Sequence, residues 1–209
     1  TDIDLFARVD AAALRFAPGA GWGYSNVGYL IAVRHLERVC NAAMAEVMRD
    51  WVLDPLGLAE ARLARTPDDM RATHFSGGWG YDPGWVFHGT VVGPVAEAAL
   101  ALHRISADGF LSEASRAEML SWHPIGGALP GRPWLTTGYG LGLMVGTMRG
   151  RRGPMFLAGH GAAGPGSVGA VYRAFGAGPG RTVAAFAAGD DEGVVETRVL
   201  QDLVSPSTT

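Results

Sequence analysis

Two short motifs, far apart in the chain, carry the side chains best suited to chemistry: Tyr24-Ser25-Asn26 and Gly159-His160-Gly161. A phenol can shuttle a proton near neutral pH if neighbouring cations favour the phenolate, so Tyr24 is a candidate base. Asn26 can both donate and accept hydrogen bonds, which suits a substrate carbonyl or the cap of the helix that follows. His160 brings an imidazole, whose charge changes near neutral pH. Such groups suit acyl transfer, in which a proton moves and a carbonyl is held.

The nucleophile for such a reaction is not evident in these residues. All 17 basic residues are arginine, so the chain has no lysine and no Ser-x-x-Lys motif. The segment 165–169 comes close to Gly-x-Ser-x-Gly, but Pro165 replaces the first glycine. Ser167 also begins a predicted strand, whereas a nucleophile elbow needs a strand before the serine and a helix after it. We therefore do not assign Ser167 as the nucleophile.

Composition excludes several other classes of protein. A formal net charge of -3 argues against binding to nucleic acid, and 48% hydrophobic residues argue against disorder. No apolar stretch approaches the roughly 18 residues of a membrane span. The histidines outside the second motif show no close metal-ligand spacing, so neither a metal nor a cofactor is predicted. These histidines are His35, His74, His88, His103 and His123.

Periodic apolar residues predict helices that position the first motif. Val27 to Cys40 has an apolar face of helical spacing, and Ala42 to Leu53 has another. Pro94 starts a third helix that stops near residue 108. A short fourth helix runs to about residue 122, with Ser115 or Ser112 as its cap. Residues 66–92, rich in Gly, Pro, Asp and aromatics, are predicted to form irregular loops.

The remaining chain predicts a sheet that carries the second motif. Four short strands separated by glycine turns are predicted at 139–146, 154–157, 167–172 and 181–187, followed by a helix at 193–204. Strands joined by short turns and then one helix indicate an antiparallel sheet in an α+β fold. We expect a mainly helical subdomain over 1–136 and the sheet with its C-terminal helix over 137–209.

In this setting the two motifs resemble those of the serine β-lactamase and penicillin-binding-protein superfamily, in the branch of class C β-lactamases, D-aminopeptidases and related esterases. The resemblance covers nearly the whole chain, including Phe16-Ala17-Pro18-Gly19 before the first motif and Pro55-Leu56-Gly57-Leu58 after the second helix. It implies a β-lactamase/transpeptidase-like fold and a small acyl, peptide or lactam substrate. It also implies that Tyr24 and His160 are catalytic and lie on opposite walls of one crevice.

The resemblance further implies that Asn26, Gly161 and Ala163 bind substrate, the backbone N–H of Ala163 being half of an oxyanion hole. Ala162 stands where the family motif has glycine, and Gly161 replaces a small hydroxyl residue. His160 stands where β-lactamases have the lysine of Lys-Thr-Gly. By analogy this histidine favours peptidase or esterase chemistry over β-lactamase chemistry.

In that family the nucleophile is the serine of a Ser-x-x-Lys motif well before the Tyr-x-Asn motif, so two interpretations stay open. The chain is the C-terminal portion of a serine hydrolase, inactive by itself, or a non-catalytic module that binds small ligands or peptidoglycan peptides. The family's first strands would then be missing beside residues 182–188, and an open edge invites pairing. We expect a dimer or association with an N-terminal segment. The analogy favours a periplasmic or secreted location, and a cytoplasmic one stays open.

Overall fold

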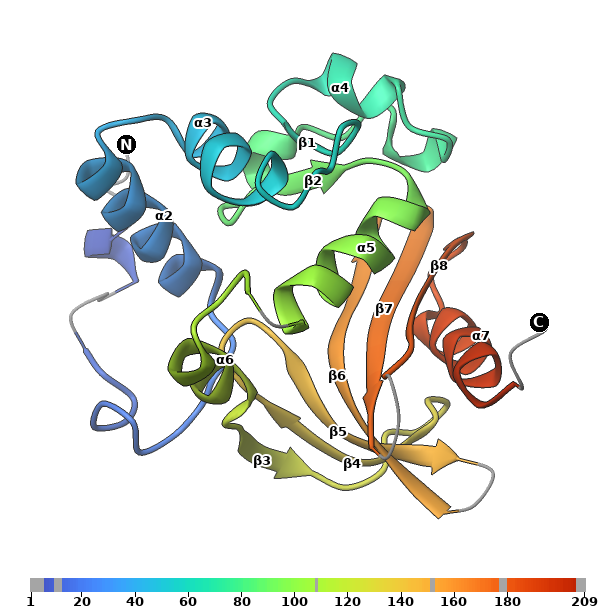
Figure 1. The fold of residues 1–209 in the computed structure, drawn as a ribbon. Coiled ribbons are helices and arrows are strands. Elements are labelled where there is room, and N and C mark those ends of the chain that lie inside the picture. The colour runs from blue at the N-terminus through green and yellow to red at the C-terminus, as the bar shows by residue number, and fades with distance from the viewer. Residues whose placement is uncertain (1–5, 10–12, 108, 151–152, 177–179, 206–209) are drawn as a thin grey trace.

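The computed structural model describes residues 6–9, 13–107, 109–150, 153–176 and 180–205. A six-stranded antiparallel sheet has helices on both faces, and a second group of helices and short strands lies to one side of it (Figure 1). The predicted α+β class, with a helical part, an antiparallel sheet and a C-terminal helix, is confirmed.

The helical part begins with α2 (Asn26–Cys40), whose ends are set by local chemistry. The Ser25 side chain accepts a hydrogen bond from the Gly28 N–H at 3.0 Å, so Ser25 is the N-cap. Asn26 is the first helical residue, which makes the capping role considered for it wrong. Asn41 ends the helix in the left-handed conformation, with φ 49°.

The other helices agree with the predicted periodic segments to within a few residues. The segment predicted as a helix over 42–53 forms a short α-helix that continues as a π-helix. Ser112, rather than Ser115, caps the fourth predicted helix by accepting from the Ser115 N–H. The elements are α3 (Met44–Met48), the π-helix η1 (Arg49–Leu53), α5 (Val95–Ser106), α6 (Glu113–Leu120) and α7 (Glu192–Val204).

Between η1 and α5 the chain forms short elements, where irregular loops were predicted for residues 66–92; α4 and β2 were not predicted. They are β1 (Arg62–Ala64), α4 (Pro67–Arg71), the 3-10 helices η2 (Ser76–Gly78) and η3 (Pro83–Trp85), and β2 (Thr90–Val92), with β1 and β2 antiparallel. Gly77 packs directly on the sheet: a Cβ there would lie 2.6 Å from the Pro165 carbonyl oxygen. The loop therefore braces the turn that ends the second-motif strand.

The sheet is a simple meander in which each strand pairs with the next one along the chain. Its central hairpin joins β6 and β7 through the two residues Pro165 and Gly166, with Gly164 opposite Ser167. The strands are β3 (His123–Gly126), β4 (Trp134–Tyr139), β5 (Met144–Gly150), β6 (Gly153–Gly164), β7 (Ser167–Phe175) and β8 (Thr182–Ala188).

The strand predicted over 139–146 is wrong. Tyr139 ends β4 and Met144 begins β5, and the residues between them form the turn of a hairpin. Gly142 has φ +72°, and the Gly140 N–H donates to the Leu143 carbonyl at 2.8 Å. The alternating Gly and Leu residues imitate a strand pattern, but glycine there permits the turn. The sheet consequently has six strands rather than four, and β4 spans the subdomain boundary proposed after residue 136.

Apolar side chains from both faces of the sheet form separate cores. On one face, Leu157 and Tyr172 pack with Val195 and Val199 of α7. On the other face, Ala158 packs with other apolar side chains that include Leu102 of α5. Since neighbouring residues of a strand point to opposite faces, β6 lies between the two cores and is held from both sides.

The last strand of the sheet, β8, pairs only with β7 among the described residues. α5 and α7 flank its two faces, but its outer edge has no partner strand in this part of the chain (Figure 1). Phe186 on this strand is 42% exposed. Association of this edge with a second chain or with a preceding segment stays a prediction.

Candidate functional site

Tyr24 and Asn26 meet at the N-terminal end of α2. The Ser25 cap keeps the backbone extended there (φ -150°, ψ 114°), so Tyr24 stands just outside the helix that Asn26 begins. The Tyr24 hydroxyl donates to Asn26 Oδ1 at 2.9 Å. This bond uses the amide oxygen of Asn26 and leaves its NH2 group to donate to a ligand. The Tyr24 side chain is 51% exposed and is therefore accessible.

His160 lies within β6, and both of its ring nitrogens are engaged. Nδ1 bonds the carbonyl oxygen of Gly161, and Nε2 bonds the hydroxyl of Tyr139. A carbonyl can only accept, so Nδ1 carries a proton, and in the neutral form of the ring Nε2 accepts from Tyr139. The imidazole is thus held in one tautomer by its own strand and by the end of β4.

A chain of aromatic rings connects Tyr24 to His160. The rings of Tyr24 and Tyr29 have centroids 5.9 Å apart, and those of Tyr139 and His160 are 5.6 Å apart. The two pairs lie close together, because Tyr29 and Tyr24 are both near enough to raise the pKa of Tyr139. Trp22 covers the Tyr139 ring from the other side, with centroids 4.6 Å apart. The structure therefore brings the two sequence motifs to one aromatic cluster.

A further ring of this cluster is the His88 imidazole, which comes from the loop before β2. It packs on Tyr29 at a centroid distance of 5.1 Å. Partial burial lowers the pKa of His88, and the nearby His160 lowers it further. Burial likewise raises the pKa of Tyr139, and the hydroxyls of Tyr29 and Tyr24 add to the rise. Both shifts favour the uncharged forms of His88 and Tyr139.

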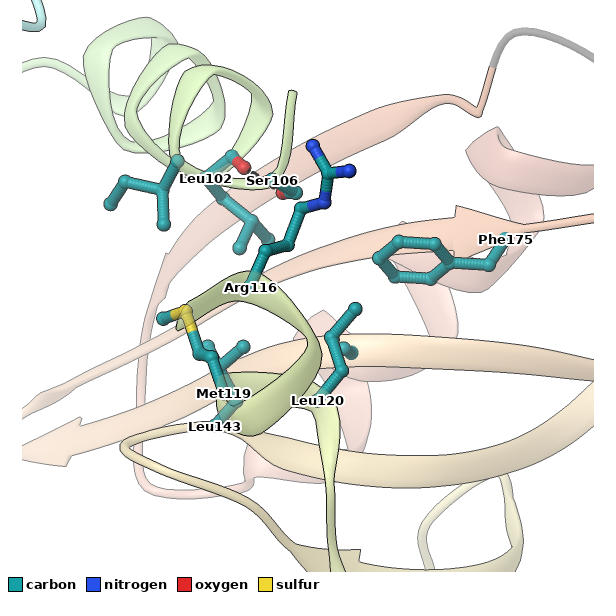
Figure 2. Close-up of a pocket in the computed structure, with 9 residues that line it drawn as sticks. Leu102, Ser106, Arg116, Met119, Leu120, Leu143 and Phe175 are labelled. Atoms are coloured by element: carbon teal, nitrogen blue, oxygen red, sulfur yellow. Dashed lines mark hydrogen bonds between the residues drawn. The ribbon is translucent and has the colours of Figure 1, made fainter. Parts of the chain in front are cut away.

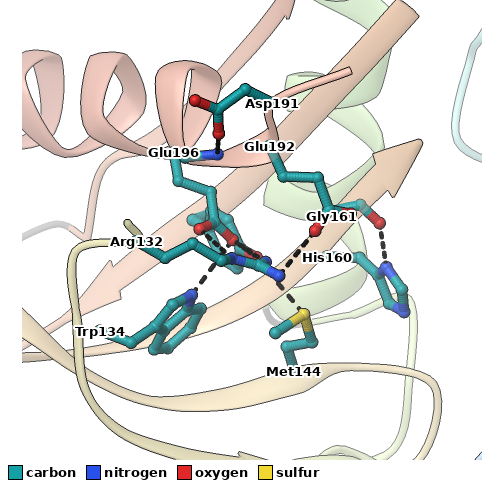
Figure 3. A network of polar contacts seen from close by, with 10 residues as sticks. Arg132, Trp134, Met144, His160, Gly161, Asp191, Glu192 and Glu196 are labelled. Carbon is teal, nitrogen blue, oxygen red and sulfur yellow. Dashed lines mark hydrogen bonds and ion pairs between the residues drawn. The ribbon is translucent and has the colours of Figure 1, made fainter. Parts of the chain in front are cut away.

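The opposite face of β6 is occupied by a buried network of charged groups (Figure 3). A Cβ added to Gly161 would lie 3.6 Å from Arg132 Nη2 and 3.7 Å from Glu192 Oε1. The Arg132 guanidinium donates Nε–H to Glu196 Oε2 at 2.7 Å and Nη1–H to Glu192 Oε2 at 2.6 Å. Trp134 and Tyr172 also donate to Glu196, which is 0% exposed. Every acceptor of this buried carboxylate thus has a partner.

The end of β6 projects beyond its neighbour on one side. Met144, the first residue of β5, pairs with Gly159, whereas β7 follows β6 as far as Gly164. From His160 to Gly164 the side of β6 toward β5 therefore has no partner strand among the described residues. Ala162 and Ala163, both exposed, lie on this stretch. The free edge offers backbone N–H and C=O groups to a ligand.

An apolar pocket lies on the α5 and α6 side of the sheet, beneath the ring of Phe175 (Figure 2). It is lined by side chains such as Leu102, Met119 and Leu143, with Ser106 and Arg116 at its rim. None of the residues of the two motifs lines it. We interpret it as a packing gap of the core, because its lining belongs to the same apolar cluster as Ala158.

Within the described part of the chain, no three His, Cys, Asp or Glu side chains gather in a way that could hold a metal ion. None of the described helices combines the length and the apolar character needed to cross a membrane. Ser167 begins β7 directly after the hairpin turn and is followed by strand residues. Its setting is not a strand-to-helix elbow.

Several residues of the cluster were not identified from sequence. They come from separate segments of the chain, and none of them lies in a motif that would mark it as functional. They are Trp22, Tyr29, His88 and Tyr139. Tyr29 follows Tyr24 by five residues, but Tyr24 lies outside α2, so helical spacing gives no signal of their contact. The positions of Tyr139 and His88 depend on tertiary packing.

Comparison with known families and structures is consistent with this geometry. The sequence matches the family described as Beta-lactamase over residues 2–201. The structure is similar to a D-stereospecific amidohydrolase from Streptomyces sp., with 20% identity and a TM-score of 0.73, over 100% of this chain and 62% of that one. It is also similar to the D-amino acid amidase from Ochrobactrum anthropi SV3 complexed with D-phenylalanine, with 19% identity and a TM-score of 0.74, over 97% of this chain and 68% of that one.

A third similar structure is a penicillin-binding protein from Bacillus halodurans, with 16% identity and a TM-score of 0.66, over 97% of this chain and 62% of that one. A comparison with curated proteins found no match. At these identities the likeness establishes the fold. The chain spans about 62% of the length of the amidohydrolase and of the penicillin-binding protein.

Proposed function

The chain belongs to the β-lactamase family, and from this premise we propose that the crevice between Tyr24 and His160 is part of a serine hydrolase site that cleaves an amide bond through an acyl-enzyme. The observation that carries the proposal is the continuous cluster from Tyr24 through Tyr29 and Tyr139 to His160. A proton-transfer group and an imidazole held in one tautomer need such a shared crevice to act on one substrate.

In the reaction that we propose, a serine hydroxyl attacks the amide carbonyl carbon and loses its proton. The C–N bond then breaks, the amine leaves with a proton, and the acyl-serine ester is hydrolysed by water. Tyr24 is the group that passes the proton, because its hydroxyl is accessible and is oriented by Asn26. The free NH2 of Asn26 holds the amide carbonyl of the substrate.

The free stretch of β6 supports a substrate-binding role for Gly161 and Ala163. An extended substrate can lie along an unpaired strand edge and use its backbone groups. The N–H of Ala163 would then donate to the carbonyl oxygen as negative charge develops on it. His160 supports this edge from within the strand, since its Nδ1–H already fixes the Gly161 carbonyl.

In this proposal the attacking serine and its lysine come from polypeptide outside the 209 residues, because these contain no lysine. Amide hydrolysis is favoured over lactam hydrolysis by the histidine in place of lysine and by the two similar amidases. A D-configured amino acid amide is the substrate class that we propose. The cluster of Tyr24 and His160 would be the retained half of its site.

The test compares this chain with the full gene product that contains it. Each is incubated with a fluorophosphonate and with a penicillin and then weighed intact by mass spectrometry. We expect no adduct on the 209-residue chain and one adduct on a gene product that contains Ser-x-x-Lys. Tyr24→Phe in that gene product should slow acylation by about 10²-fold or more. Tyr81→Phe is the matched control, since Tyr81 packs with Trp85 outside the crevice.

Three outcomes would contradict the proposal. An adduct on the 209-residue chain would reveal a nucleophile within it. A gene product that contains Ser-x-x-Lys but gains no mass would exclude the acyl-enzyme. A gene product without that motif that still binds D-phenylalanine would favour the alternative, a non-catalytic module for small ligands or peptidoglycan peptides.

A further inference from the structure

The imidazoles of His160 and His88 differ in whether their ring nitrogens already have hydrogen-bond partners. Both nitrogens of His160 are engaged, by Tyr139 and by the Gly161 carbonyl. His88 contacts the Tyr29 ring, but neither of its nitrogens has a hydrogen-bond partner among the residues that the structure describes. The residue is also exposed. Of the two rings, His88 is therefore the one that can bind a ligand directly.

The surroundings of His88 contain aromatic rings and a second imidazole. The Tyr29 ring of α2 packs against it, and His160 of β6 lies near enough to lower its pKa. The Tyr24 ring adjoins Tyr29. No carboxylate or guanidinium among the described residues contributes to the altered pKa of His88 or of Tyr139. An anion would find no countercharge here.

We propose that His88, with the ring faces of Tyr29 and Tyr24, receives the free ammonium group of the substrate and so selects amino acid amides over N-acylated ones. This rests on the function proposed above. A neutral imidazole nitrogen accepts a hydrogen bond from an ammonium, and tyrosine faces attract a cation within about 6 Å of the ring centroid. His88 is in this sense a specificity-determining residue.

The same arrangement predicts how binding depends on pH. Partial burial and the neighbouring His160 lower the pKa of His88, so its ring is neutral at pH 7. Protonation, which the lowered pKa moves below the ordinary value of about 6.5, would remove the acceptor and place two positive charges together. Ammonium binding should therefore be constant above about pH 6.5 and weaken as the pH falls toward the lowered pKa. A role limited to packing would not produce this profile.

The experiment uses the 209-residue chain and follows the histidine ring signals by NMR, assigned with single His→Gln variants. D-Phenylalanine amide and N-acetyl-D-phenylalanine amide form a matched pair of probes that differ in the charged amine. We expect the first to shift the His88 signals and the second to bind about tenfold more weakly. His88→Phe, which keeps a ring on Tyr29, should remove this difference. His35→Gln on α2, whose ring contacts Arg38, should leave it unchanged.

Equal binding of the two probes, or no shift of the His88 signals up to the solubility limit, would overturn the inference. The outcome can be separated from that of the proposed function. Selective ammonium binding by a gene product that is never acylated would leave His88 as a recognition residue of a binding module. If the gene product is acylated, and its His88→Phe variant keeps the same preference between the two amides, the inference about His88 is overturned and the proposed function is not.

Discussion

The two faces of β6, represented by the consecutive residues His160 and Gly161, differ in exposure and in hydrogen bonding. On the His160 face the groups are exposed and incompletely hydrogen-bonded, as Tyr24 and His88 illustrate. On the Gly161 face a fully buried carboxylate is surrounded by donors from Arg132, Trp134 and Tyr172. Unsatisfied groups are available for a ligand, whereas satisfied ones fix the strand. The comparison indicates that one side of β6 can bind a ligand, while the groups on the other side hold the strand in place.

The largest effect should come from removing the buried carboxylate. Glu196→Ala would leave the Trp134 N–H and the Tyr172 hydroxyl without their acceptor, and would leave the Arg132 guanidinium with Glu192 alone. Breaking a buried ion pair in this way costs about 3–5 kcal/mol of the free energy of unfolding. Urea denaturation followed by circular dichroism measures it. Glu192→Ala is the control, because Glu192 is partly exposed, and it should cost about 1 kcal/mol or less. Equal losses would remove the distinction between the buried and the exposed carboxylate.

The two glycines beside His160 should respond differently to the same added methyl group. A Cβ at Gly159 would lie 2.0 Å from the Val171 carbonyl oxygen and 2.6 Å from the Tyr172 ring. Gly159→Ala should therefore destabilise the protein by about 1–3 kcal/mol. At Gly161 the nearest atom is 3.6 Å away, so Gly161→Ala should stay within about 0.5 kcal/mol. Thermal unfolding of both variants would test this, and a larger loss for Gly161→Ala would contradict the packing described.

A smaller effect is expected from coupling between the two imidazoles. His160→Gln removes one of the two causes that lower the pKa of His88, so that pKa should rise, while partial burial keeps it below its ordinary value. NMR titration of the His88 ring measures the change. The same shift makes the stability depend on pH, because the folded state resists protonation of His88 more than the unfolded state does. The contribution of the neutral His88 to the free energy of unfolding is present above about pH 6.5 and is lost as the pH falls toward the lowered pKa. His88→Gln should flatten that part of the pH dependence.

The smallest effect on folding should belong to the residue with the largest proposed role in catalysis. Tyr24→Phe removes one exposed hydrogen bond, to Asn26, and should change the free energy of unfolding by no more than about 0.5 kcal/mol. Urea denaturation of the Tyr24→Phe and Glu196→Ala variants under the same conditions compares their free energies of unfolding. A loss comparable to that of Glu196→Ala would mean that Tyr24 serves the fold rather than a ligand.

The sequence predicted most of the helices because caps and periodicity are local. Residues 27–40 and 193–204 differ from α2 and α7 by one residue at an end. The sheet was predicted less well, since Gly140-Leu141-Gly142-Leu143 alternates like a strand although glycine there serves a turn. Strands β3 and β4 were missed, because their short, proline- or glycine-containing sequences become strands through pairing with neighbours.

For the site, the sequence supplied the two motifs but not what joins them. Tyr24, Asn26 and His160 were identified from the residues in their immediate sequence. Tyr29 and His88 acquire their importance only when α2 and the loop before β2 pack side by side, as their ring contact shows. Such contacts depend on tertiary structure, and single-residue types carry no signal of them.

The meander order of the sheet has a consequence for how the chain acquires its structure. Because every strand from β3 to β8 pairs with its neighbour in the chain, each pairing closes only a short loop. Local contacts of this kind form faster than distant ones. We expect the sheet with α7 to become protected from amide exchange earlier than the contacts that α2 makes with distant segments. The crevice would then be the last region to be completed, when the first motif docks onto a strand that is already in place.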